Sequence, residues 1–471
     1  MRRLTTATAG VAVTVALAAG CSGAGPERAT AAPSSPIASL QDDQLYQSGV
    51  DPAARVRRMA RLGARVIRVD LRWDLVAPKR PADARDHRDP AYRWQRYDRI
   101  VSAARRNGVS LLFTAWGTPA WARDRRVSTT PRFPGRATRP RNAADFGRFG
   151  AAAARRYARR GVRRWEAWNE PNLPLFLRPQ FVRRGGRFVG VSPATYRRML
   201  NAFYREVKRV DRGARIGGGV TAPIGDRCPF NCPNSPNDRV APLDFWRGLT
   251  SGRARPRMDR ISHHPYPVTR PRNETSPRVS YVDLYNLQRL TNLLANTRVG
   301  RKPVWLTEFG FGTRPVPEYP LAVSERQQAA FLVDAYRRVV QTPQVELMTW
   351  FHYRDHPEWT SGLVRRNGRE KPSARAFAFP VAPLRTGVVR SGTPVRVRGQ
   401  ARAARREGRV RVERRRGGRW VAETTVRGGA DGSFVAVVQP SSSSRYRARW
   451  LGATRSGGVR VSRPFTVKVA R

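Results

Sequence analysis

The strongest constraint on the fold is a regular alternation of short β-rich runs with helix-like segments along the first 380 residues. The β-rich runs lie at 37–41, 64–73, 109–116, 162–169, 214–219, 258–266, 303–309 and 345–352, and helical patterns follow them, from 52–62 to 372–377. Such alternation predicts a parallel sheet covered by helices, and eight repeats favour a closed (β/α)₈ TIM barrel, an α/β fold. The first run lacks a following glycine-rich phosphate loop, which argues against a nucleotide-binding fold.

The pattern changes after residue 383. The runs 395–398, 409–413, 434–438, 445–449 and 465–469 alternate polar and apolar residues with period two, and glycines and serines cluster between them. This texture predicts a small C-terminal antiparallel β-sandwich, similar to immunoglobulin-like or fibronectin-like modules. We therefore expect three parts: a signal peptide and linker at 1–36, a barrel at 37–382 and a β-sandwich at 383–471.

The first residues are typical of a bacterial export signal. Two arginines precede the apolar run 11–19, which is too short to span a bilayer. Two cleavage alternatives remain open: residues 17–21 resemble a lipoprotein box that would place a lipid on Cys21, whereas 29–31 suit an ordinary signal peptidase. The expected location is extracellular or the outer face of the membrane, with membrane contact only through that lipid. Export also permits a disulfide between Cys228 and Cys232.

The net charge of +56 is extreme, and it has two interpretations. Only five of the 90 basic residues are lysines, and the arginines are spread along the whole chain, as a GC-rich genome would produce without selection for a partner. Alternatively, the charge favours weak adhesion to an anionic cell-wall polymer. The even spread does not predict a specific nucleic-acid partner.

Two glutamates, Glu170 and Glu308, stand where the fourth and seventh predicted strands end. The carboxyl ends of the strands and the loops after them build the active site of a TIM barrel. Both glutamates follow apolar or aromatic residues, so each carboxyl is expected in a partly dry pocket. Two carboxyl groups with different pKa values, one donating a proton and one attacking as an anion, are what glycoside hydrolysis requires.

The motifs around these glutamates resemble those of clan A glycoside hydrolases, the barrel superfamily that includes cellulases and β-xylosidases. The resemblance covers residues 37–380 and rests on Trp-Asn-Glu-Pro at 168–171 and Thr-Glu-Phe-Gly at 307–310, whose flanks mix features of the endoglucanase and β-xylosidase families. It implies a retaining mechanism with Glu170 as acid/base and Glu308 as nucleophile. It also implies roles near the substrate for the following residues: Arg68, which would support the nucleophile, Asn169, His264, Tyr266 and Trp350.

The sequence therefore predicts an exported retaining glycosidase that acts on a poly- or oligosaccharide without a cofactor. The alternative is a non-catalytic carbohydrate- or polyanion-binding protein on a barrel scaffold. Trp116 and Trp350 are the expected platforms for sugar rings. No metal is expected, because the spacing of His263, His352 and His356 matches no zinc motif. The carboxyl groups of the two glutamates are expected to lie about 4.5–6 Å apart.

Overall fold

The computed structural model describes residues 35–470 except 48, 133, 226–234, 236, 268–269, 272–280 and 316–320. The predictions of an export signal, of a lipid on Cys21 and of a disulfide between Cys228 and Cys232 fall outside these residues. Within the described part of the chain, no helix combines the length and the apolar character needed to cross a membrane.

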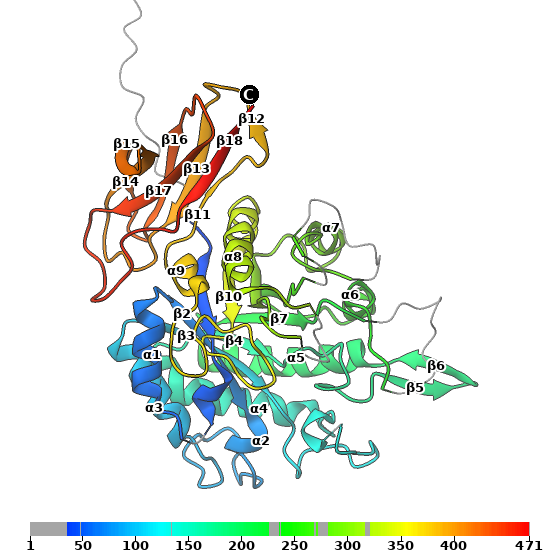
Figure 1. Ribbon diagram of the computed structural model, residues 1–471. Helices are drawn as coiled ribbons and strands as arrows, with labels where there is room; N and C mark the ends of the chain where they lie inside the picture. Colours follow the sequence, from blue (N-terminus) through cyan, green and yellow to red (C-terminus); the bar gives the residue numbers. More distant parts are fainter. Residues whose placement is uncertain are drawn as a thin grey trace, which may run out of the picture. The chain divides into compact units, whose positions relative to one another are not determined.

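The predicted barrel is confirmed (Figure 1). Eight strands close in the order β1-β10-β9-β8-β7-β4-β3-β2, and all neighbouring pairs are parallel. The strands are β1 (Ile37–Gln41), β2 (Val66–Arg72), β3 (Ser110–Trp116), β4 (Arg164–Ala167), β7 (Arg215–Thr221), β8 (Arg260–His263), β9 (Val304–Phe309) and β10 (Val345–Phe351). They are buried along almost their whole length, which is typical of parallel strands covered on both faces.

Helices follow the strands at the predicted places, except for a short helix directly after β2 that the sequence analysis did not predict. They are α1 (Pro52–Arg61), α2 (Trp73–Val76), α3 (Gln95–Arg106), α4 (Ala143–Tyr157), α5 (Ser192–Val210), α6 (Pro242–Thr250), α7 (Gln288–Ala295), α8 (Glu325–Val339) and α9 (Pro372–Ala378). Local sequence explains several starts. The Asp51 carboxylate caps α1, Ser324 and Gln327 form a capping box at α8, and proline stands in the first turn of α5 and α6.

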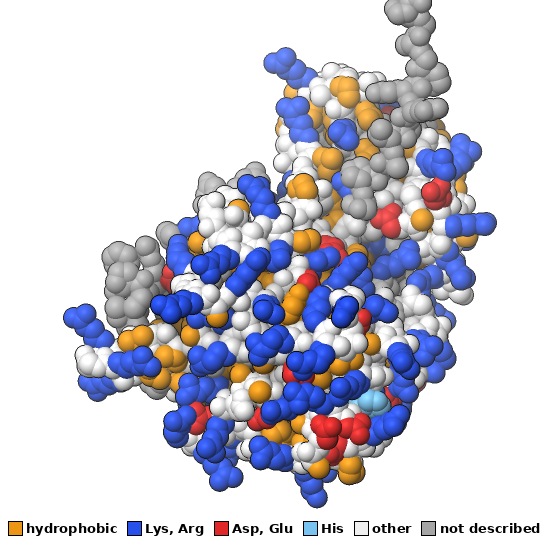
Figure 2. Space-filling model, turned by 180° about the vertical axis from the view of Figure 1, so that it is seen from behind, with side chains coloured by type: hydrophobic (Ala, Val, Ile, Leu, Met, Phe, Trp, Pro, Cys, Tyr) orange, Lys and Arg blue, Asp and Glu red, His pale blue; other side chains and the backbone are white. Residues whose placement is uncertain are grey.

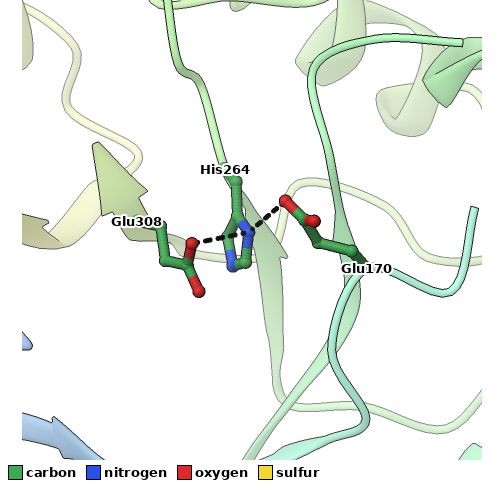
Figure 3. A group of neighbouring side chains, drawn as sticks. All are labelled: Glu170, His264 and Glu308. Carbon is green, nitrogen blue, oxygen red and sulfur yellow. Dashed lines mark hydrogen bonds and ion pairs between the residues drawn. The ribbon is translucent and has the colours of Figure 1, made fainter. Parts of the chain in front are cut away.

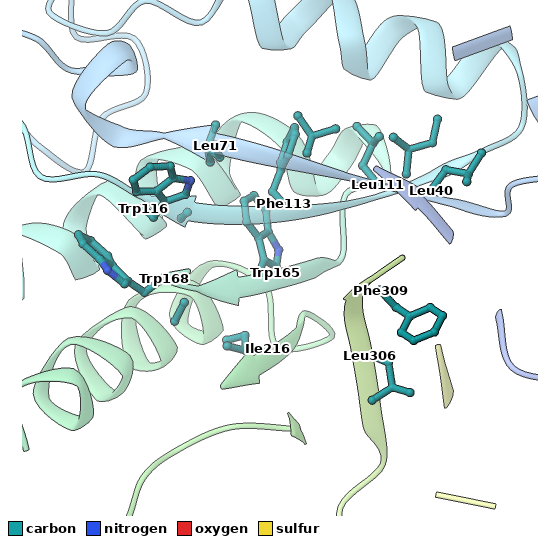
Figure 4. Packing of buried hydrophobic residues seen from close by; sticks show 14 of the residues in the cluster. Leu40, Leu71, Leu111, Phe113, Trp116, Trp165, Trp168, Ile216, Leu306 and Phe309 are labelled. Carbon is teal, nitrogen blue, oxygen red and sulfur yellow. The ribbon is translucent and has the colours of Figure 1, made fainter. Parts of the chain in front are cut away.

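The barrel has an apolar layer outside its strands and a mixed interior. Leu40, Leu71 and Phe113 belong to the main apolar cluster, which the helices and strands share (Figure 4). Inside the barrel, a separate apolar floor consists of Val66, Leu112, Trp305 and Leu347. Arg68 stands two residues after Val66 on β2 and therefore points into the same interior. The barrel interior thus changes from apolar to polar within two residues along the strand.

A hairpin that the sequence analysis did not predict lies in the loop after β4. It consists of β5 (Phe181–Arg184) and β6 (Arg187–Gly190), joined by Gly185 and Gly186, which have φ angles of +52° and +79°. Two consecutive positive φ angles are the requirement of a tight type I′ hairpin turn, which glycine meets without strain. The Gly-Gly pair between two apolar runs was the available sequence signal.

The C-terminal residues form two sheets around one core. The first sheet contains β11 (Val381–Pro383), β13 (Val395–Gln400) and β16 (Ser433–Val438). The second contains β12 (Val388–Val389), β18 (Phe465–Val469), β17 (Ser444–Trp450), β14 (Gly408–Arg416) and β15 (Arg419–Gly428). Phe434, Tyr446 and Trp450 are buried between them.

Two details of this module differ from prediction. Strands β12 and β18 pair in parallel, so the expectation of a purely antiparallel sandwich is wrong at that edge, although the other pairs are antiparallel. Strand β15 was not predicted, because this edge strand is largely exposed on both faces and therefore shows no alternation of buried and exposed residues.

Candidate active site

The two predicted glutamates meet at one end of the barrel. Glu308 lies on β9, Glu170 follows the end of β4, and His264 follows β8, so that the three side chains point toward one another (Figure 3). One side-chain oxygen or nitrogen from each residue lies within 4.8 Å of the others. The side chains of Glu170 and Glu308 keep exposed fractions of 11% and 10%, so both are mostly but not completely buried.

The backbone that presents Glu170 adopts an uncommon conformation. Trp168 and Glu170 have φ angles of +76° and +35°, in the left-handed region that residues other than glycine rarely occupy. The surrounding structure holds this turn, because the amide of Trp168 donates to the carbonyl of Ala115 and its indole N–H donates to that of Phe176. A strained backbone conformation persists only where contacts with the surrounding structure hold it in place. Such conformations are concentrated at functional sites.

Arg68 is completely enclosed and is surrounded by hydrogen-bond acceptors. Its Nη1 donates to Glu308 Oε1 at 2.5 Å and to Gln41 Oε1 at 2.5 Å. Its Nε donates to Glu166 Oε2 and its Nη2 to Asn169 Oδ1, both at 2.8 Å. The arginine on β2 thus fixes groups from β1, β4 and β9, and it touches the nucleophile candidate directly.

Tyr266 provides the second donor to Glu308. Its hydroxyl lies 2.9 Å from Glu308 Oε2. Burial and the neighbouring Glu308 carboxylate raise the pKa of Tyr266 well above its usual value, so the phenol keeps its proton and donates it. Both oxygens of Glu308 therefore receive a hydrogen bond, one from a guanidinium and one from a hydroxyl.

Glu170 has a different environment. Its Oε1 lies 2.8 Å from Nδ1 of His264, and the same nitrogen is 3.6 Å from Glu308 Oε2. Burial and the positive charge of Arg68 hold the pKa of His264 well below its usual value, so the imidazole is neutral. Burial raises the pKa of Glu170 to about 8, an effect that Arg68 opposes and Asp70 reinforces. Glu170 is therefore protonated at neutral pH.

The hydrogen-bond donors around the pair favour the negative charge on Glu308. Burial raises the pKa of Glu308 well above its usual value, an effect that Arg68 opposes and the nearby Glu170 reinforces. When Glu170 carries the proton, its repulsion of the Glu308 anion disappears. A carboxylate that accepts hydrogen bonds from Arg68 and Tyr266 is then stabilised as an anion. The two carboxyl groups thus differ in their hydrogen-bond donors, and this difference favours the anion on Glu308 and the proton on Glu170.

Asn169 borders the same carboxyl pair and is almost fully buried. Its amide oxygen accepts the hydrogen bond from Arg68, which fixes the orientation of the side chain. Among the residues that the structure describes, its amide nitrogen donates to no protein group. This nitrogen is therefore available to a sugar hydroxyl, as the resemblance implied.

Three residues expected to contact the substrate are placed otherwise. Arg68 donates to Glu308, which confirms the predicted support of the nucleophile, but Arg68 and His264 have no exposed surface, so neither is open to direct contact with a sugar. Trp350 is 2% exposed, packs edge-on against Phe309 and donates its indole N–H to the carbonyl of Ser361. The prediction of a sugar platform at Trp350 is therefore wrong, because this ring faces the apolar layer outside the strands.

The aromatic side chains beside Tyr266 are Phe351 and Trp359. Both rings meet Tyr266 edge-on, with centroids 6.0 and 5.5 Å away, and they contact each other at 5.5 Å. Phe351 was missed from the sequence. The indole N–H of Trp116 donates to Asp70, and the guanidinium of Arg72 lies 4.6 Å from the centre of its ring. Trp116 is only 5% exposed, so it offers no open face to a sugar ring.

Further polar residues near Arg68 also escaped sequence reasoning. Gln41 ends β1 and donates from Nε2 to Asp43 Oδ1 at 2.7 Å. The Asp43 side chain is 29% exposed and lies 3.4 Å from Nε2 of His352. Asp70 stands two residues beyond Arg68 on the same face of β2, and that spacing was the signal which could have identified it. Asp43 and Asp70 therefore add carboxylates that can accept hydrogen bonds at the site.

The donor set formed by Glu170, His264 and Glu308 could in principle hold a divalent metal ion. The contacts of these residues fit proton transfer better. Arg68 and Tyr266 already donate to both oxygens of Glu308, and a metal ion there would face a guanidinium nitrogen bound to the same carboxylate. We therefore derive no step through a metal.

Comparison with known proteins gives distant structural likenesses only. No protein-family model and no curated protein sequence matches the chain. Solved structures similar to it include a GH128 endo-β-1,3-glucanase from Sorangium cellulosum, with 18% identity, 68% of this chain and 93% of that chain covered and a TM-score of 0.38. A family 1 β-glucosidase from Thermotoga maritima is 11% identical, with 74% of this chain and 98% of that chain covered and a TM-score of 0.43. An α-L-arabinofuranosidase from the same organism is 13% identical, with 88% of this chain and 96% of that chain covered and a TM-score of 0.43.

All three of these proteins are glycoside hydrolases. At such low identities and TM-scores the likenesses do not decide the activity of this chain. The function proposed below therefore rests on the geometry of the site.

Proposed function

We propose that this chain is a retaining glycoside hydrolase. The observation that carries the proposal is the short distance between two carboxyl groups that have different hydrogen-bond donors: oxygens of Glu170 and Glu308 approach within 4.8 Å. Retaining enzymes place these groups about 5–5.5 Å apart, whereas inverting enzymes need about 6.5–9.5 Å to fit a water molecule between carboxylate and sugar. The arrangement favours direct attack by Glu308.

The reaction proceeds in two steps. The Glu308 carboxylate attacks the anomeric carbon while Glu170 gives its proton to the departing glycosidic oxygen, and a glycosyl ester forms on Glu308. Glu170, now a carboxylate, takes a proton from a water molecule. The resulting nucleophile attacks the same carbon and breaks the ester bond, which restores the Glu308 anion and the Glu170 acid. Two inversions leave the sugar with its original configuration.

The surrounding residues position these groups. Arg68 and Tyr266 hold Glu308 in place and favour its ionised form before attack and after release. His264 holds Glu170 from the side of β8. The free amide nitrogen of Asn169 can donate to the hydroxyl next to the anomeric carbon, a contact that strengthens in the transition state.

We also propose that the enzyme works outside the cell. The support is the signal-like sequence of the first residues, with its basic start and short apolar run. A lipid on Cys21 and a freely secreted form are both consistent with that sequence.

The stereochemistry of hydrolysis tests the proposed mechanism. We expect the purified chain to hydrolyse at least one member of a panel of aryl glycosides and polysaccharides, and proton NMR of the first-formed product should show the configuration of the substrate. A first product of inverted configuration would contradict the retaining mechanism. Absence of hydrolysis across the panel, by a chain with a folded circular dichroism spectrum, would contradict the glycosidase proposal.

The pH dependence should report the proton on Glu170. Burial raises the pKa of this group to about 8, so the acid form is present below that pH and is lost above it. We expect kcat/KM to fall as the pH rises through about 8, since this parameter reports groups of the free enzyme. Glu170→Gln cannot titrate there, so the residual activity of this variant on activated aryl glycosides should lack this alkaline limb. An unchanged limb in the variant would assign the titration to another group.

A further inference from the structure

The outer face of the five-stranded sheet carries a concentrated group of basic side chains. Residues 384–471 contain 22 Lys and Arg but only four Asp and Glu. In strands β14, β17 and β18 the apolar residues point into the core, so the alternate residues form the outer face, and the register of β15 with β14 places Trp420 and Arg427 on the same face. We give the name arginine face to seven basic residues of this surface: Arg409, Arg411, Arg427, Arg445, Arg447, Arg449 and Lys468.

Strand register places like charges directly opposite each other on this face. Arg409 of β14 pairs with Arg427 of β15, and Arg411 of β14 pairs with Arg449 of β17. Neighbouring strands lie about 4.8 Å apart, and like charges in opposed positions destabilise a sheet. An anion that lies across the strands would remove this repulsion.

Carboxylates offset only part of the charge. Glu413 accepts hydrogen bonds from Arg447 and Arg449, at 2.5 and 2.9 Å, and Glu407 pairs with Arg427 at 2.5 Å. By contrast, Arg409, Arg411 and Arg445 are exposed and form no ion pair with any residue that the structure describes. Three cations on adjacent strands are thus left for an external anion.

This pattern distinguishes the arginine face from the generally basic surface. Basic side chains are spread over the face of the molecule that Figure 2 shows. Many of those on the barrel are paired with carboxylates. Asp98, for example, binds Arg156 and Arg160, and Asp334 binds Arg337 and Arg338. The number of arginines therefore does not define a site, whereas two cross-strand arginine pairs, each with one member that lacks a carboxylate partner among the described residues, do.

An aromatic ring accompanies the charges. Trp420 of β15 stands opposite Arg415 of β14, and the guanidinium of Arg447 lies 4.4 Å from the centre of its ring. The indole is partly exposed. A flat aromatic face among cations suits a ligand that combines ring faces with negative charge.

We propose that the arginine face binds a linear acidic polysaccharide, one whose sugar units carry carboxylates. The guanidinium groups would pair with the carboxylates, and Trp420 would stack against a sugar ring. The choice of a polysaccharide over a nucleic acid rests on the proposed function, since the same chain carries a glycosidase site. The module then holds the enzyme on the acidic polymer that contains or surrounds its substrate.

The test measures binding and hydrolysis separately, with the full chain. The variant R409Q/R411Q/R445Q removes three unpaired cations from the arginine face. The control R57Q/R61Q/R105Q removes three arginines from exposed positions on α1 and α3 that form no ion pair with a described residue. Dissociation constants are measured for labelled polygalacturonate, for neutral dextran and for a single-stranded oligothymidylate, at two salt concentrations.

We expect the face variant to lose about tenfold or more in affinity for polygalacturonate and the control less than about twofold, because the opposed arginines make the local contacts. Binding should weaken with salt, and dextran should bind far more weakly. Trp420→Ala should weaken the binding that persists at high salt. Hydrolysis of a small aryl glycoside should be unchanged in all variants.

Equal losses in face and control variants would overturn the proposal, because binding would then follow net charge alone. Tighter binding of the oligothymidylate than of polygalacturonate would overturn the assignment to a polysaccharide. If the wild-type chain hydrolyses no glycoside but shows selective loss in the face variant, the proposed function fails while the anion-binding face stands.

Discussion

Glu308→Ala is expected to abolish hydrolysis of every glycoside, with kcat falling by a factor on the order of 10⁵–10⁶, as is found when a covalent nucleophile is removed from an enzyme. Alanine offers no atom that can bond to the anomeric carbon, and a good leaving group cannot compensate for that loss. The variant also leaves Arg68 without its contact to the nucleophile. The measurement is kcat on the most reactive aryl glycoside that the wild-type chain accepts.

A matched control separates chemistry from charge. Glu206 lies on α5 and forms ion pairs with Arg85 and Arg209 outside the barrel. Glu206→Ala should therefore retain nearly all activity although it removes the same functional group. Activity of the Glu308 variant within tenfold of wild type, in a protein with an unchanged circular dichroism spectrum, would remove Glu308 from the role of nucleophile.

The second large effect concerns Glu170. Glu170→Ala should lower kcat on natural saccharides by about 10²–10⁴, the range supplied by a positioned general acid. Aryl glycosides with good leaving groups need little protonation, so the first step should suffer much less with them. The glycosyl ester on Glu308 should then accumulate, because no base activates water, and a burst of released phenol should be visible.

Azide provides the diagnostic for this variant. As a small anion it needs no base, and it can occupy the space vacated by the Glu170 side chain. Azide should therefore raise the turnover of Glu170→Ala on aryl glycosides and give a glycosyl azide with the configuration of the substrate. Equal losses on natural and activated substrates, without rescue by azide, would exclude Glu170 as the acid/base.

Much of the barrel could be predicted because parallel strands buried on both faces give continuous apolar runs with helical patterns between them. The predicted ranges 37–41 and 242–250 coincide with β1 and α6. Glu170 and Glu308 could be found because each stands at the end of a predicted strand, follows apolar or aromatic strand residues, and belongs to a motif that resembles those of clan A glycoside hydrolases. The contacts of Arg68 could not be derived in full, since they join four strands far apart in the sequence.

The error at Trp350 has a specific cause. Successive residues of a strand point to opposite faces, so only one of two adjacent aromatic residues can face the site. An error of one residue therefore assigns the wrong side chain to the site. Along β10 the alternation is regular: Leu347 belongs to the interior cluster, Trp350 faces the apolar layer outside the strands, and Phe351 lies beside Tyr266. The motif therefore identified the end of the strand correctly but chose the wrong one of its two adjacent aromatic residues.

The enclosure of Arg68 bears on how this protein can change in evolution. Loss of Glu308 leaves the guanidinium with Glu166, a buried partner at 2.8 Å, so the fold keeps a compensated charge. Loss of Arg68 would strand Glu166, which has no exposed surface, and an unpaired buried carboxylate costs several kcal/mol. Descendants that abandon catalysis can therefore discard the two glutamates that perform the chemistry more easily than the arginine between them. In a set of related sequences, Arg68 and Glu166 should persist together after Glu170 or Glu308 has been lost.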